Sequence, residues 1–246
     1  METPPEPLRR EVSTYLSWAA DAEGERAIAA RTFHLTAAYE PADFAALSDR
    51  LSAADATGSF SILARDLDEQ AEAVADLAAD GHEIALHGLR HATYSGVDYD
   101  DAHDELSTAM DAIEDATGIQ PEGFHVPFMG ASAGTVRAAD ELGIEWLLGR
   151  PDGGTSHDLT VLDPVAPWDT RLLEDGQEPA AAFERLNRPP GTDEAFLMHP
   201  NVQEFYDGSA AFDDWLASRS PGAVIDALSG TDEPLVLDCV RPLRVV

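Results

Sequence analysis

The chain has 246 residues, of which 44% are hydrophobic, so it can bury a sizeable core in one large α/β domain. Its 47 acidic residues face 15 basic ones, all of them arginine, and the formal net charge is −32. Because phosphate binding needs basic patches, this charge argues against nucleic acids and anionic membranes as partners. We interpret the acidity as an adaptation to molar salt, where a Debye length of roughly 3 Å screens repulsion between carboxylates.

Neither the cysteine content nor the start of the sequence suggests secretion. The single cysteine, Cys239, excludes an intrachain disulfide and lies in an apolar run, where a small buried side chain is expected. No segment reaches the ~18 apolar residues of a membrane span, and the first residues lack a signal-peptide pattern. We therefore expect a cytoplasmic protein; the sequence leaves its oligomeric state open.

Predicted strands and helices alternate along most of the chain. The first expected elements are a strand at residues 12–18, a polar loop to about residue 31 and an extended piece at residues 33–36. The periodicity then predicts helices at 41–54, 67–79, 99–116 and 133–142, interleaved with strands at 59–64, 83–87, 124–127 and 144–148. This alternation implies parallel strands joined by helical crossovers, as in a (β/α) barrel or an open doubly wound sheet.

The remaining residues are less regular. Short strands are expected at residues 160–162 and 195–198, on either side of a proline-interrupted stretch at 164–190. Helices at 211–218 and 223–228 should precede a last strand at 235–240. We expect a single domain over residues 1–246, in which residues 201–246 supply C-terminal helices and a closing strand.

Two histidines four residues apart follow the apolar strand at residues 83–87. His87 and His91 lie in the segment G-H-E-I-A-L-H-G-L-R-H. Neutral imidazole nitrogens suit Zn²⁺ and similar divalent ions, and both can reach one ion if the backbone turns helically after Leu86. The alternative is that two polar histidines merely cap a strand and a turn.

This segment resembles the second motif of the polysaccharide deacetylase family, the metal-dependent N-deacetylases of chitin, peptidoglycan and related amino sugars. The same superfamily includes cyclic-amide hydrolases of the allantoinase type. The resemblance runs in order from about residue 12 to residue 200, and the chain looks like a divergent, halophilic member. It implies an α/β fold, a distorted (β/α) barrel of fewer than eight strands, and a divalent metal cofactor, with zinc as the first expectation.

In the family, an aspartate at the end of the first strand is the third metal ligand. Its motif is like T-F-D-D-G or F-D-V-D, and the earlier aspartate is the general base. In the F-D-V-D register, Trp18 takes the aromatic position, Ala19 stands at the base position and Asp21 at the metal position. In the T-F-D-D-G register, alanines stand at both aspartate positions. The metal ligands implied by the resemblance are therefore Asp21, His87 and His91.

The third motif, like R-x-P-Y in the family, reads F-H-V-P-F here, at residues 124–128. His125 replaces an arginine that contacts the base aspartate in the family, so both partners of one contact have changed. Such a coupled change avoids an unpaired cation and indicates a remodelled pocket. The implied roles are Glu23 or His125 as substitute base, the Phe128 backbone N–H as oxyanion donor, and Pro127 with Phe128 as substrate contacts.

The segment F-L-M-H-P, residues 196–200, resembles the last family motif, an apolar strand that ends in the general-acid histidine. An imidazole near neutral pKa suits protonation of a leaving amine, which favours His199 as that acid. The alternative is a histidine that merely ends a strand. Trp168 follows a proline-rich loop and either stacks on a sugar ring or packs in the core, and Asp169 is placed to orient His199.

Three functions stay open at this point. The first is metal-dependent hydrolysis of an amide carbon–nitrogen bond, as in N-deacetylation of an amino sugar or polysaccharide. The second is hydrolysis of a cyclic amide or ureide by the same fold. The third is a catalytically silent homologue that binds a glycan or a partner protein, because loss of the usual base would cost on the order of 10²–10⁴ in rate.

Overall fold

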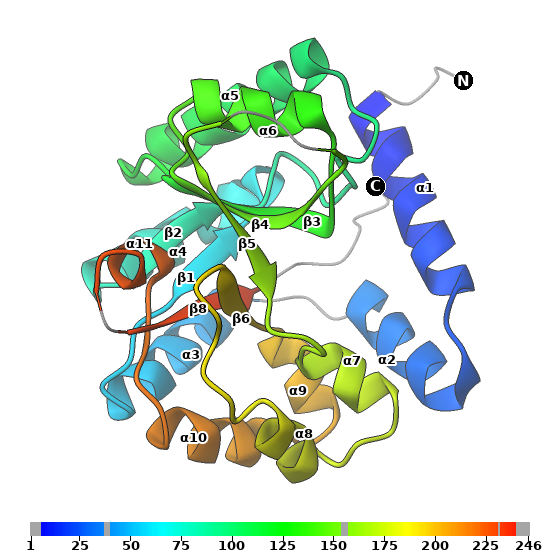
Figure 1. The fold of residues 1–246 in the computed structure, drawn as a ribbon, viewed down its shortest axis with the longest axis vertical. Helices are drawn as coiled ribbons and strands as arrows, with labels where there is room; N and C mark the ends of the chain where they lie inside the picture. The colour runs from blue at the N-terminus through cyan, green and yellow to red at the C-terminus, as the bar shows by residue number, and fades with distance from the viewer. Residues whose placement is uncertain (1–5, 37–39, 154–156, 231, 240–246) are drawn as a thin grey trace.

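A closed barrel of parallel strands forms the centre of the computed structural model, which describes residues 6–36, 40–153, 157–230 and 232–239 (Figure 1). Among these residues, seven strands pair in the order β1-β2-β3-β4-β5-β6-β8, and β8 also pairs with β1. The expected distorted (β/α) barrel is thus confirmed. The strands are β1 Ser59–Ile62, β2 Glu83–Leu86, β3 Gly123–Ala131, β4 Trp146–Pro151, β5 Thr160–Pro164, β6 Glu194–Met198 and β8 Glu233–Asp238; β7, Pro221–Gly222, adds to the start of β8.

Helices cover the outside of the barrel, and two of them have ends that the sequence signals predict. Asp98 caps α5 by accepting the Asp101 backbone N–H at 3.0 Å, and Gly118, at φ 75°, ends it. Ser132 caps α6 in the same way through the Thr135 N–H. The helices after the first two are α3 Pro41–Ala53, α4 Leu67–Ala79, α5 Tyr99–Thr117, α6 Ala133–Glu141, α7 Asp169–Glu174, α8 Pro179–Arg185, α9 Pro200–Phe205, α10 Ser209–Ala217 and α11 Val224–Ala227, with a 3₁₀ turn at Ala64–Asp66.

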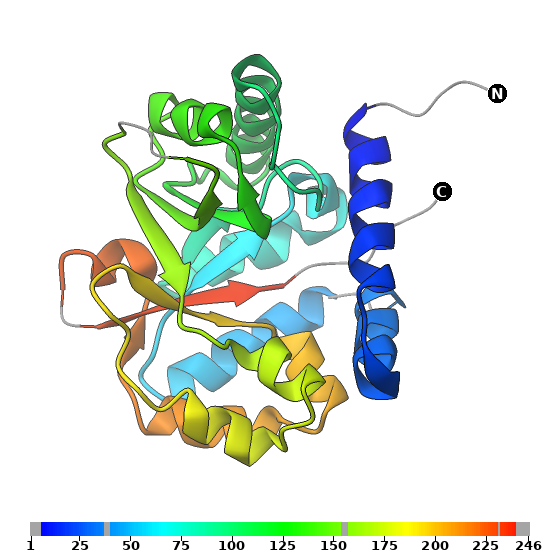
Figure 2. The ribbon, with the colours of Figure 1, turned by 45° about the vertical axis from the view of Figure 1, so that its right-hand side comes forward.

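The N-terminal segment differs from the expectation. Residues 12–18 and 33–36 belong to two helices, α1 Glu6–Ala20 and α2 Gly24–Thr36, so the predicted first strand, polar loop and extended piece are wrong. Glu11 and Tyr15 are buried one helical turn apart, whereas Leu16 is 68% exposed. The packing of this buried face stabilises a helix here, although several residues of the stretch have a high β propensity. Figure 2 shows α1 upright beside the barrel, with β8 pointing toward it.

The interior of the barrel follows the two-residue period of its strands. Residues two apart point to the same face, so one side chain in two enters the barrel. The middle of the interior is filled by apolar side chains, among them Ala85, Leu148, Leu162, Leu197 and Val236. At the amino-terminal ends of the strands, Trp146 Nε1 donates to the half-buried Glu83 carboxylate at 2.7 Å. A Cβ at Gly123 would lie 2.1 Å from the Trp146 ring, so only glycine fits there.

One step further along the same inward rows, at the carboxyl ends of the strands, the side chains become polar. These residues are Ser61, His87, His125, His199 and Asp238, all of them buried or nearly so. In parallel (β/α) barrels the carboxyl ends of the strands carry the reactive groups. The period of two thus brings five polar residues from five strands or strand ends to one place.

Candidate metal and catalytic site

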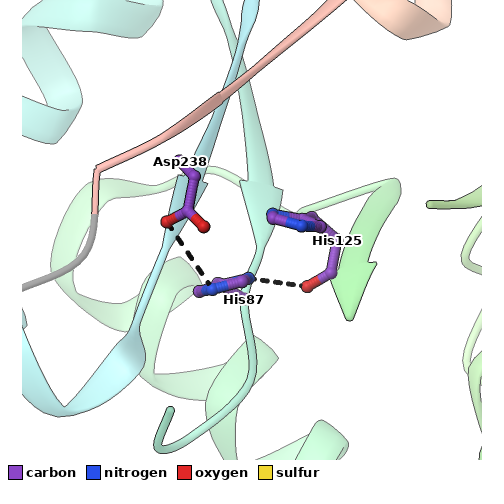
Figure 3. A group of neighbouring side chains, drawn as sticks. All are labelled: His87, His125 and Asp238. Carbon is purple, nitrogen blue, oxygen red and sulfur yellow. Dashed lines mark hydrogen bonds and ion pairs between the residues drawn. The ribbon is translucent and has the colours of Figure 1, made fainter. Parts of the chain in front are cut away.

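The site is centred on three buried residues from three strands: His87 after β2, His125 in β3 and Asp238 at the end of β8 (Figure 3). One possible ligand atom of each lies within 4.8 Å of the other two. The rings of His87 and His125 are stacked at 4.4 Å. His87 Nε2 lies 3.8 Å from Asp238 Oδ1, and neither atom has a hydrogen-bond partner among the described residues.

The protonation of this group follows from its contacts. His87 Nδ1 donates to the backbone carbonyl of His125 at 2.7 Å, so Nε2 carries the free lone pair when the ring is neutral. Burial lowers the pKa of both His87 and His125, which keeps them neutral. Burial opposes ionisation of Asp238, but the imidazoles around it outweigh burial and hold its pKa well below the usual range. A lone pair facing a carboxylate oxygen in a buried place is the arrangement that a cation would stabilise.

His199, after β6, lies beside this cluster and is held from behind by Asp169 at the start of α7. Its Nδ1 donates to Asp169 Oδ1 at 2.8 Å, and its Nε2 lies 3.4 Å from Asp238 Oδ2. Burial alone would lower the pKa of His199, but Asp169 and Asp238 outweigh it and raise the pKa to about 10. Asp169, fully buried, also accepts from the His199 backbone N–H and from Gln203. The imidazole is therefore fixed in orientation and carries a proton.

His91 lies beside the three-residue cluster, with its ring centre 4.9 Å from that of His87, and it also contacts α1. Its Nδ1 lies 2.7 Å from the Tyr15 hydroxyl, and its backbone N–H donates to the buried Glu11 at 3.2 Å. Burial, reinforced by Asp238 and Asp66, raises the pKa of Tyr15, so the hydroxyl keeps its proton and can donate to the ring nitrogen. The His91 ring also contacts the ring of Phe128, at 4.5 Å.

A cavity of about 560 Å³ opens above these residues. Its described lining includes the floor residues His125, His199 and Asp238, the rim aromatic residues Trp18, Phe128 and Trp168, and the arginines Arg31, Arg150 and Arg171. Phe128 and Met129 have positive φ angles of 55° and 66°, where the register between β3 and β4 breaks. This turn of the backbone directs Phe128 into the lining beside His91.

The structure brings together some of the residues that the sequence grouped. The rings of His87 and His91 lie 4.9 Å apart, and His91 and His199 both line the cavity. Asp21, exposed just after α1, also lines the cavity but lies outside the cluster of His87, His125 and Asp238. Glu23 is exposed in the turn before α2, and neither it nor the buried Pro127 lines the cavity. Trp168 is half-buried in the lining.

Asp238 is the member of the candidate site that the sequence motifs missed. It ends the closing strand, in the run L-V-L-D. Pairing of β8 with β1 places this strand directly next to the one that precedes the His87 strand. Its position at the carboxyl end of an apolar strand could have marked Asp238 as a site candidate. Every strand of a barrel can place a residue at that face.

Comparisons with known proteins agree with this architecture. Residues 26–147 match the family model described as Polysaccharide deacetylase. These residues carry the polysaccharide deacetylase domain that the sequence resemblance implies. The search of curated proteins finds no match.

Solved structures of this family share the fold at low sequence identity. A presumed polysaccharide deacetylase from Mycobacterium smegmatis is 19% identical, with a TM-score of 0.60 over 96% of this chain and 92% of its own. A CE4 family pseudoenzyme from Bacillus anthracis is 17% identical, with a TM-score of 0.59 over 82% and 67%. A family 4 carbohydrate esterase from Streptomyces lividans, in complex with acetate, is 15% identical, with a TM-score of 0.52 over 71% and 81%. Against two mutants of the pseudoenzyme, one with restored enzymatic activity, the chain spans 64% and 65% of their length.

Proposed function

We propose that the chain is a metal-dependent hydrolase that removes the acetyl group from an N-acetylated amino sugar in a glycan. The observation that carries this proposal is the unpaired, buried couple of His87 Nε2 and Asp238 Oδ1, 3.8 Å apart beside a proton-carrying His199. The family match supports the choice of an acetamide substrate.

The proposed metal ligands are His87, His125 and Asp238. Two neutral imidazoles and one ionised carboxylate are the donors that Zn²⁺ takes, and three protein ligands leave a position open for water or substrate. When bound, a divalent ion would polarise the amide carbonyl and lower the pKa of water. Asp21 and His91 are left out of this set because neither belongs to the group whose possible ligand atoms all lie within 4.8 Å of one another.

The protein's own groups supply the proton movements of amide hydrolysis. Asp238 is the carboxylate of the cluster, so we assign it the role of base; Ala19 lies in α1 and not at the end of a barrel strand. His199 already carries a proton, which it donates to the leaving nitrogen, and Asp169 fixes the ring in the orientation required. The proton that Asp238 takes from water then returns to His199 Nε2, which lies 3.4 Å from Asp238 Oδ2. The reaction consumes one water and yields acetate and a free amine.

Metal binding and hydrolysis are tested separately. Protein purified in high salt should contain stoichiometric divalent metal, and Zn²⁺ should raise its Tm; Asp238→Asn and His87→Ala should abolish both effects. His199→Ala should keep the metal but lower kcat for an N-acetylglucosamine oligomer by roughly 10²–10⁴. As a matched control, His157→Ala changes a histidine outside the cavity lining and should alter neither.

The substrate panel should include a cyclic amide and a ureide. Turnover of one of these, with the sugar oligomer untouched, would move the assignment to the second class of hydrolase. A metal-free protein that turns over no substrate would contradict the proposal.

A further inference from the structure

We propose that Arg150 and Arg171, at the rim of the cavity, bind the carboxylate of an acidic sugar next to the N-acetylated one. The substrate would then be an anionic glycan, such as one that alternates N-acetylated sugars with uronic acids. This inference rests on the proposed function, since it names the substrate of the same cavity.

The charge of the cavity lining differs from that of the molecule. The chain carries 47 acidic against 15 basic residues, yet the lining holds three arginines, Arg31, Arg150 and Arg171, against three carboxylates, Asp21, Glu174 and Asp238. In a protein so acidic, equal numbers of arginines and carboxylates in one concave lining remove the negative excess locally. Such a lining repels an anionic ligand less than the rest of the surface does.

Two of the three arginines are available to a ligand. Arg31 is held by Glu174, 3.2 Å away in an ion pair with little exposure. The guanidinium of Arg171, on α7, makes no hydrogen bond or ion pair with any part of the chain that the structure describes, and the side chain is exposed. Arg150, at the end of β4, meets Asp163 at 3.4 Å, but both are more than half exposed, and exposed pairs of this kind hold weakly.

One of the two arginines lies beside an aromatic ring that suits a sugar, and the other follows that ring closely in the sequence. Arg171 is three residues beyond Trp168, and the Arg150 guanidinium lies 5.6 Å from the Trp168 ring centre. An indole ring stacks on the apolar face of a pyranose, while a guanidinium binds a carboxylate through two parallel hydrogen bonds. A uronic acid presents both features on one ring, whereas a neutral sugar leaves the guanidinium groups without a partner.

The other charged residues of the lining do not favour an anion, which leaves Arg150 and Arg171. Asp21 is exposed on the α1 side of the rim, and Glu174 is neutralised by Arg31. On the floor, His199 lies between Asp169 and Asp238, so its charge is already balanced. An anionic group is therefore favoured at Arg150 and Arg171 and nowhere else along the described lining.

The test compares two tetrasaccharides that share N-acetylglucosamine, a hyaluronan tetrasaccharide with uronic acids and neutral chitotetraose. Their Kd values are measured by ligand-observed NMR on the full-length protein, at the lowest salt that keeps it folded by circular dichroism. Wild type should bind the hyaluronan fragment more tightly. The double variant Arg150→Gln, Arg171→Gln should weaken its binding roughly tenfold relative to chitotetraose. Arg185→Gln, an exposed arginine on α8 outside the cavity, is the matched control and should leave the ratio of the two Kd values unchanged.

Equal Kd values for the two oligomers in wild type would overturn the inference, as would an equal loss of preference in Arg185→Gln. If wild type hydrolyses chitotetraose but shows no preference in binding, the proposed function survives and the anionic substrate does not. If it binds the hyaluronan fragment through the two arginines but deacetylates neither oligomer, the anion site stands and the hydrolase assignment falls.

Discussion

At the level of single residues, His82 shows how burial makes a histidine sensitive to pH. It lies just before β2, and its Nε2 is 3.1 Å from the Ser48 hydroxyl, which itself donates to Asp80. Nε2 therefore carries the proton, and Nδ1 is buried without a hydrogen-bond partner among the described residues. Burial lowers the pKa of His82 below 6.5, although Asp80 opposes the shift. Protonation would add a buried N–H that nothing in this part of the structure accepts.

We predict that His82 reduces stability in acid. The unfolded chain binds a proton near pH 6.5 and the folded chain only below that value, so the stabilisation is complete above 6.5 and is lost as the pH falls further. His82→Gln keeps an N–H donor for Ser48 but does not titrate. Its free energy of unfolding, measured in urea from pH 8 to pH 5, should decline less than that of wild type. His103→Gln, on α5, should decline as wild type does; a parallel decline in His82→Gln would refute the argument.

The residues of the candidate site were predictable from the sequence where the signal for each lay in its own strand. His87 and His199 each end an apolar strand, and the strand pattern alone directs them to the carboxyl-end face. Asp238 depends on which strand closes the barrel, a pairing between residues 59–61 and 236–238 that no local pattern records. His125 was recognised as an altered position, but its nearness to His87 and Asp238 depends on three strands at once.

At the level of elements, α1 is fastened to the barrel by buried polar contacts. Glu11, fully buried, forms ion pairs with Arg65 and with Arg90 and accepts the His91 backbone N–H. Arg10 adds a hydrogen bond to Glu105 on α5, at 3.0 Å. These contacts join α1 to the loop that carries His91, so the helix and the edge of the site are coupled.

We predict that Glu11→Gln destabilises the fold by about 3 kcal/mol, because it removes the negative charge that two partly buried arginines need. Chemical denaturation measures the change, and protease cleavage in the turn before α2 reports whether α1 detaches first. Glu25→Gln makes the same chemical change on the exposed start of α2 and should alter the free energy of unfolding by less than about 0.5 kcal/mol. Equal effects of the two substitutions would show that the Glu11 contacts add little.

The elements from residue 41 onward were largely predictable, and the first two were not. Phe44, Leu47 and Leu51 repeat at helical spacing and are buried in α3, as the pattern required. In α1, by contrast, the inward face is set by Glu11 and Tyr15, whose partners lie more than fifty residues away. Because a glutamate occupies the buried face, the sequence offers no regular spacing of hydrophobic residues from which to predict this helix. The short α9, after His199, also escaped prediction, because proline and asparagine begin it.

At the level of the whole molecule, the net charge of −32 dominates behaviour in solution. We predict that Tm rises steeply as KCl goes from dilute to molar, because salt screens repulsion among the carboxylates. Differential scanning fluorimetry measures this directly, and choline chloride at equal ionic strength distinguishes screening from specific binding of potassium. A Tm independent of salt would contradict the halophilic interpretation. Among the described residues, no helix is long and apolar enough to cross a membrane.

The closing strand also sets when the site can exist during synthesis. β1 leaves the ribosome about 170 residues before β8, an interval on the order of 10–30 s at ordinary rates of translation. Until β8 arrives, β1 has an unpaired parallel edge, as does β6 once it is made, and the histidines of the floor lack Asp238. The β1 edge is thus exposed to edge-to-edge association for most of the synthesis, and the arrival of Asp238 completes the barrel and the candidate cation site in one event.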